Sequence, residues 1–119
     1  MNPPTQPGPL SDAALSHAMD GLWARFLPEI KARVAVLEAA TQTASEGKLT
    51  AEQREASQAA AHKLAGVLGT FGLTRGTVLA RELELMFARE SSLSRDAGAQ
   101  LAGIVAELRS MIESRESSA

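Results

Sequence analysis

Apolar side chains recur along the chain at the three- and four-residue spacing of amphipathic helices. The clearest stripe begins after Arg95 and consists of Ala97, Leu101, Ile104, Val105, Leu108, Met111 and Ile112. Residues at these intervals share one face of an α-helix, which advances about 100° per residue. Runs of β-branched residues, which would favour strands, are missing. We therefore predict an all-α protein without a sheet.

The same spacing predicts helical structure near the start of the chain. One apolar stripe extends over Leu15–Phe26, is interrupted by Pro28, and resumes over Ile30–Leu37. A proline inside a helix lacks an amide donor and clashes with the preceding turn. We therefore expect a kink or break at Pro28, with an additional N-terminal helix lying across one end of the domain. Gly47 is expected to end the following segment.

Two more helices are predicted between residues 51 and 88. Thr50 and Gln53 have the spacing of a capping box, which would start a helix that ends near Gly72. Thr74 is expected to cap the next helix, whose core face would consist of Val78, Leu79, Leu83, Met86 and Phe87. Short connections make successive helices antiparallel. Four apolar stripes that close on one another then form an antiparallel up-down four-helix bundle.

The two ends of the chain differ from this helical body. Four prolines precede residue 10, so residues 1–10 are expected to form a flexible Pro-rich tail. Ser11 is a suitable N-cap for the first helix. Residues 11–115 are expected to form one domain with one core. The polar residues 116–119 are expected to fray as a C-terminal tail.

Composition narrows the classes of function. The 119 residues include no cysteine and only two histidines, His17 and His62, so we expect no disulfide and no metal site. The net charge of −2 argues against nucleic acid as a partner. No apolar run approaches the roughly 18 residues of a membrane span, and no signal peptide is visible. We therefore expect a cytoplasmic monomer that binds neither nucleic acid nor membrane.

His62 lies nearly opposite the apolar stripe of its own helix, so its imidazole is expected to face water. Its neighbours on the outer face are small or polar: Ala59, Gly66 and Gly69, with Gln58 at the edge. Each glycine inside a helix costs about 1 kcal/mol relative to alanine. Close approach of another surface to the imidazole would offset that cost.

This stretch resembles the signature of the histidine-containing phosphotransfer (HPt) domain family. The matching residues, which need no insertion, are His62, Leu64, Gly66, Phe71-Gly72 and Leu83-Glu84. Two positions depart from the family pattern: Ala65 stands where a lysine is often found, and Val67 where serine or alanine is common. Lys63, one residue after the histidine, is a candidate for the missing charge.

The resemblance implies a phosphocarrier in a two-component phosphorelay. His62 would accept a phosphoryl group from the aspartate of a response-regulator receiver domain and pass it to another receiver, with a hybrid sensor histidine kinase as a further partner. The receiver would supply Mg²⁺, so no cofactor is expected on this chain. No ATP-binding segment is visible, and we expect no enzymatic activity of its own. The expected docking surface consists of Gln58, Ala59, Ala65, Gly66 and Gly69.

Two charged residues are candidates for supporting His62. A hairpin turning near Leu73 would place Glu84 beside the imidazole, where its carboxylate could accept a hydrogen bond and fix the tautomer. A merely solvated carboxylate is the alternative. Lys63 could steady the phosphoryl charge or serve only solubility. His17 has no small-residue neighbourhood and is interpreted as an ordinary surface histidine.

Other functions stay open to different degrees. Because Ala65 and Val67 depart from the family pattern, the alternative function is a docking module that has the HPt shape but performs no phosphotransfer. A cofactor-binding or enzymatic bundle is disfavoured, because the sequence shows no Glu-x-x-His spacing and no phosphate-binding glycine loop.

Overall fold

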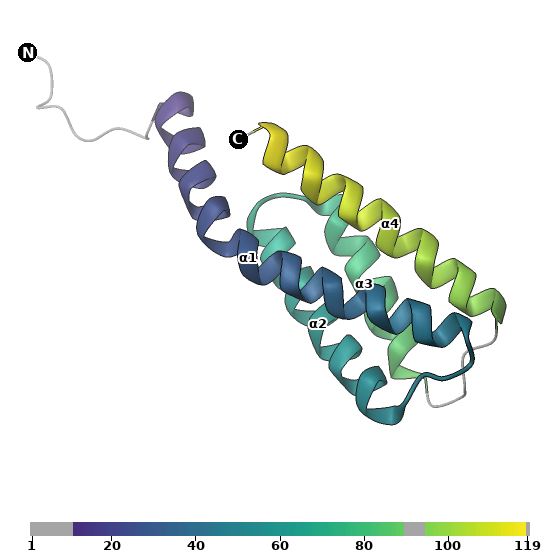
Figure 1. Ribbon diagram of the computed structural model, residues 1–119. Helices are drawn as coiled ribbons and strands as arrows, with labels where there is room; N and C mark the ends of the chain where they lie inside the picture. The colour runs from purple at the N-terminus through teal and green to yellow at the C-terminus, as the bar shows by residue number, and fades with distance from the viewer. Residues whose placement is uncertain (1–10, 90–94, 119) are drawn as a thin grey trace, which may run out of the picture.

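The computed structural model describes residues 11–89 and 95–118, and these form four helices without a strand. The helices are α1 (Asp12–Ser45), α2 (Ala51–Thr70), α3 (Thr74–Ala88) and α4 (Arg95–Ser118). Each helix contacts the next along the chain, and α4 also packs against α1 (Figure 1). This arrangement confirms the predicted all-α fold. The expected tail over residues 1–10 lies outside the described residues, as do residues 90–94.

Helix α1 is one continuous helix of 34 residues that passes through Pro28. Of the kink or break expected at Pro28, the break does not occur, and the separate N-terminal helix across one end of the bundle is not present. Trp23 and Ile30 are both buried, so packing holds the helix on either side of the proline. Pro28 itself is exposed, where water can bond the carbonyl that lost its donor. The helix bends in its first half instead of ending (Figure 1).

The ends of α1 and the start of α2 follow local sequence signals. The Ser11 hydroxyl accepts a hydrogen bond from the Ala14 amide at 3.1 Å. Gly47 follows α1 with φ +70°, a left-handed conformation that glycine adopts freely. The Thr50 hydroxyl accepts from the Gln53 amide at 3.0 Å, and the Gln53 side chain accepts from the Thr50 amide at 3.3 Å. The predicted capping box is confirmed.

A tight turn joins α2 to α3 and makes them antiparallel. Gly72 has φ +71°, and the Leu73 amide donates to the Leu68 carbonyl at 2.9 Å. Thr74 is the first residue of α3, not its cap. The N-cap position belongs to Leu73, which makes no side-chain capping bond. The cap expected at Thr74 is therefore wrong, and backbone hydrogen bonds of the turn hold this end of the hairpin.

The core lies between the four helices and is made of aliphatic residues with two large aromatic rings. The largest fully buried hydrophobic side chains are Trp23, Phe87, Ile30, Leu37, Leu64, Leu68, Leu79, Leu83, Leu101 and Leu108. Trp23 packs edge-on against Phe71, with ring centroids 5.1 Å apart. Three apolar residues assigned to core faces are instead exposed: Leu15 at 49%, Phe26 at 36% and Val78 at 44%.

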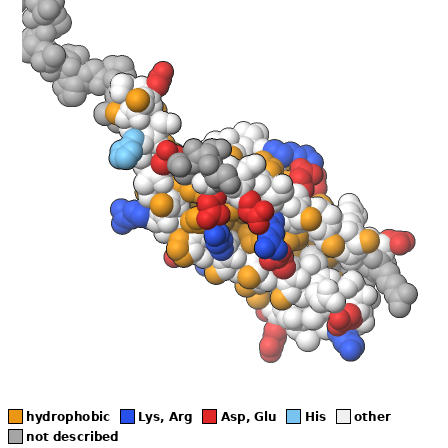
Figure 2. Space-filling view, turned by 45° about the horizontal axis from the view of Figure 1, so that its top comes forward, with side chains coloured by type: hydrophobic (Ala, Val, Ile, Leu, Met, Phe, Trp, Pro, Cys, Tyr) orange, Lys and Arg blue, Asp and Glu red, His pale blue; other side chains and the backbone are white. Residues whose placement is uncertain are grey.

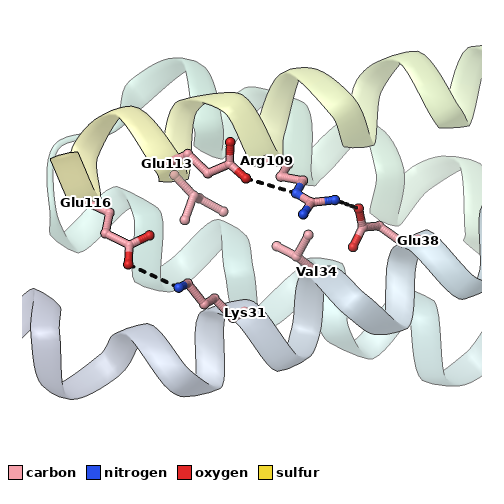
Figure 3. A pocket seen from close by; sticks show the side chains of 7 residues that line it. Lys31, Val34, Glu38, Arg109, Glu113 and Glu116 are labelled. Carbon is pink, nitrogen blue, oxygen red and sulfur yellow. Dashed lines mark hydrogen bonds and ion pairs between the residues drawn. The ribbon is translucent and has the colours of Figure 1, made fainter.

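Ion pairs close the surface between α1 and α4. Arg109 contacts Glu38 at 2.8 Å and Glu113 at 3.0 Å, and Lys31 contacts Glu116 at 3.1 Å (Figure 3). They surround a cavity of about 220 Å³ whose floor includes Val34. In Figure 2, acidic and basic side chains meet on this face between apolar ones. Helix α4 continues to Ser118, beyond the domain boundary expected at residue 115.

Candidate functional site

His62 projects from the outer face of α2. Its side chain is 68% exposed. The opposite face of the helix is buried through Ala60, Leu64 and Leu68, as the apolar stripe predicts. Because buried residues fix the rotation of α2, the exposure of His62 follows from the register of the whole helix and needs no local distortion.

Glu84 lies across from His62 on α3 and contacts its ring. The distance between His62 Nδ1 and Glu84 Oε2 is 2.8 Å, and the Glu84 side chain is 22% exposed. An ionised carboxylate can only accept, so this hydrogen bond requires the proton on Nδ1. In the neutral imidazole the lone pair is then on Nε2, the nitrogen opposite the carboxylate. The geometry therefore selects one tautomer and leaves Nε2 without a described partner.

Contacts further along α2 and α3 fix the register that places Glu84 beside His62. The Thr77 hydroxyl donates to the Ala65 carbonyl at 3.3 Å, which joins the helices three residues beyond His62. A methyl group built on Gly69 would lie 3.4 Å from the same hydroxyl. Leu83, next to Glu84, is fully buried. The hairpin is thus held between the His62–Glu84 pair and the turn.

The surface around His62 is open on the glycine side. A methyl group built on Gly66 would meet nothing within 4 Å. Gly66 is therefore not small to admit another described helix of this chain. Gly69 and Ala59 are also exposed, and Gln58 is half-buried. These residues are placed where a partner could approach the imidazole.

Ala65 does not belong to that surface. It is only 2% exposed, and its carbonyl faces Thr77. Including Ala65 in the expected docking surface was therefore wrong. Three residues after His62 the helix has turned by about 300°, which points the side chain between α2 and α3.

The charges near His62 differ from the sequence-based picture. Lys63 is exposed and forms no ion pair with any described residue, but it projects about 100° around α2 from His62. Ala65 and Gly69 contact α3 from the other side of His62, so Lys63 points away from Glu84. Arg81 on α3 is exposed and likewise has no partner among the described side chains. The sequence analysis missed Arg81, although its spacing of three from Glu84 would have placed it on the same face.

The remaining candidates lie elsewhere. His17 is exposed on α1, in the part of the helix before the buried Trp23. The Arg115 guanidinium lies over the Trp23 ring at 5.3 Å, which is a packing contact and not a ligand box. Within residues 11–89 and 95–118, no group of three or more histidine or carboxylate side chains could hold a metal ion. None of the described helices is long and apolar enough to cross a membrane.

The site therefore consists of an exposed histidine on the side of a helical bundle, with a carboxylate on its Nδ1 and no described partner on Nε2. Comparison with known protein families assigns the chain to a class. The Hpt domain model matches residues 21–117, and the chain therefore belongs to the Hpt domain family. Hpt domains take part in phosphorelays, in which they exchange phosphoryl groups with receiver domains.

One curated relative extends this comparison over part of the chain. Protein RcaC from Microchaete diplosiphon is 39% identical over 62 residues, which are 52% of this chain and 10% of RcaC. The chain thus covers about a tenth of the length of that relative. No solved structure gives a significant match.

Proposed function

We propose that this chain carries phosphoryl groups on His62, accepting them from the aspartate of one receiver domain and passing them to another. The observation that carries the proposal is the hydrogen bond of 2.8 Å between His62 Nδ1 and Glu84. It orients an exposed ring so that Nε2 faces outward as a nucleophile. A hybrid sensor histidine kinase that contains a receiver is a further expected partner, and the expected place of action is the cytoplasm.

The proposed transfer step needs no general base on this chain. The Nε2 lone pair attacks the phosphorus of the aspartyl phosphate, and a P–N bond forms. The P–O bond to aspartate breaks, and its electron pair returns to the carboxylate. The proton stays on Nδ1, so the product is a phosphoimidazolium whose positive ring faces Glu84. The carboxylate therefore stabilises a charge that develops during transfer.

The two partners divide the remaining work. The receiver would bring Mg²⁺, which neutralises charge on the transferring group. This chain would bring clearance, because the approaching loop must come within reach of Nε2 for in-line attack. Gln58, Ala59, Gly66 and Gly69 form the docking surface in this proposal. Onward transfer runs the same step in reverse on a second receiver.

The test is labelling from a receiver domain that carries ³²P on its aspartate. The wild-type chain and H17Q, the matched histidine control, should both gain acid-labile label. H62Q should gain none and should melt at the wild-type temperature, because the side chain lies outside the core. Label retained in H62Q would refute the assignment. Receiver binding by wild-type protein without any label would favour the alternative, a docking module without phosphotransfer.

A further inference from the structure

Arg81 is an exposed cation beside the His62–Glu84 pair that the transfer step above does not use. It belongs to a stripe on α3 formed by Thr77, Arg81 and Glu84, which are spaced four and three residues apart and so share one face. Thr77 and Glu84, at the two ends of this stripe, both contact α2.

The contacts at those two ends place Arg81 along α2. Glu84 meets His62, and Thr77 meets the Ala65 carbonyl and lies against Gly69. Because the helices are antiparallel, Arg81 lies alongside the segment of α2 that begins at His62. That segment includes Gly66, where a methyl group would meet nothing within 4 Å.

The charge balance at the site changes once His62 is phosphorylated. A phosphoryl group brings nearly two negative charges at neutral pH. Glu84 is already 2.8 Å from the ring and adds a third. Arg81 lies on the same face of α3 as Glu84, and it forms no ion pair with a carboxylate among the described residues. Guanidinium groups bind phosphoryl oxygens in bidentate geometry, which suits this position.

The geometry points to Arg81 as the residue that binds the phosphoryl oxygens of phosphorylated His62. This inference rests on the proposed function, since it requires a phosphoryl group on Nε2. The guanidinium offsets the repulsion between the phosphoryl group and Glu84. Arg81 contacts the group that is transferred, while Glu84 holds the ring that carries it.

The experiment uses the whole chain and a small-molecule donor, phosphoramidate, so that no receiver is needed. The ³¹P chemical shift of the phosphohistidine is followed against pH to obtain the pKa at which the phosphoryl group loses its last proton. The variants are R81A, R81K and the matched control R25A. Arg25 is exposed on α1 and has no partner among the described residues. It lies two residues after the buried Trp23, so it faces away from the bundle.

A nearby cation favours the dianion, so removing it should raise the phosphoryl pKa. R81A should raise it by about 0.5 unit at low salt, the effect of a unit charge roughly 5 Å away in water. R81K should restore most of the difference, R25A should match the wild type, and added salt should shrink the effect. All variants should melt like the wild type, because the side chain is exposed and unpaired.

Two results would overturn the inference while the proposed function survives. One is an R81A titration that superimposes on the wild type. The other is an equal shift in R25A, which would mean a general effect of net charge. A wild-type chain that gives no phosphohistidine signal, with phosphoramidate and with phosphorylated receivers alike, would instead refute the proposed function itself.

Discussion

His62 and Glu84, which are 22 residues apart in the sequence, meet through a hydrogen bond of 2.8 Å between Nδ1 and Oε2. Removing the carboxylate should therefore slow phosphoryl transfer to His62, the step in which the ring becomes positive. We expect E84A to slow transfer to His62 about tenfold, as for loss of one hydrogen bond to a charged group. E84Q, which keeps an acceptor without the charge, should transfer at a rate between those of the wild type and E84A. Labelling rates from a phosphorylated receiver measure this, and E84A transferring at the wild-type rate would contradict it.

Stability and transfer should move in opposite directions at Gly66. Because nothing lies within 4 Å of a methyl group at this position, G66A should stabilise the fold by up to about 1 kcal/mol. G66Q should also fold. Both should slow transfer, glutamine far more than alanine, because the side chain projects toward the docked partner. Thermal melting and receiver-to-His62 transfer are measured on the same two variants.

Gly98 provides the control for that experiment. A methyl group there would lie 3.2 Å from the Ser45 Cα, where α4 crosses the end of α1. G98A should therefore lower the melting temperature, because backbone atoms of two helices must move apart. A G66Q variant that melts as early as G98A would show that the space around Gly66 is needed by the fold.

Lys63 offers a weaker, salt-dependent contribution. Its side chain is exposed and points away from Glu84, so K63A should slow transfer only a few-fold and leave receiver binding unchanged. The difference should shrink between low and moderate salt, since an exposed charge is screened. Equal rates for K63A and wild type at both salt concentrations would assign Lys63 to solubility alone.

The ion pair between α3 and α4 predicts a pH dependence of stability. The hydrogen bond from Arg75, at 2.8 Å, holds the pKa of Glu107 below its ordinary value of 4.5. A carboxyl group whose pKa is lowered by folding stabilises the fold above that ordinary value and loses the contribution as pH falls through the lower, folded one. E107Q should therefore melt slightly below wild type at pH 7, and the gap should close as the pH falls through the lowered pKa of Glu107. A gap that persists in acid would mean that the pair acts through packing.

Much of the fold could be predicted from periodicity and caps. The helical faces, the capping box at Thr50 and the glycine stops at Gly47 and Gly72 all depend on nearby residues, and each is confirmed. The break considered at Pro28 does not occur, because helix breaking by proline is a local tendency, whereas burial of Trp23 and Ile30 is a tertiary effect that outweighs it. Thr74 was misjudged for a similar reason, since backbone bonds of the turn replaced the side-chain cap.

The candidate site was also predictable where it depends on local signals and not where it depends on tertiary packing. The exposure of His62 and its pairing with Glu84 follow from helix rotation and a short turn, and both could be anticipated. Ala65 was expected on the surface and is buried, and Val78 was expected in the core and is exposed. An isolated helical pattern does not say where the neighbouring helices lie. Arg81 was missed because its relevance depends on the register between α2 and α3.

The turn through Gly72 has a consequence for how such chains diversify. It brings His62 and Glu84 together within a single hairpin, so the proposed transfer would depend on α1 and α4 only for support from behind. The outward faces of those two helices, including the exposed Leu15, would carry no constraint from that reaction. Substitutions there can change which proteins recognise the chain while the reaction stays the same.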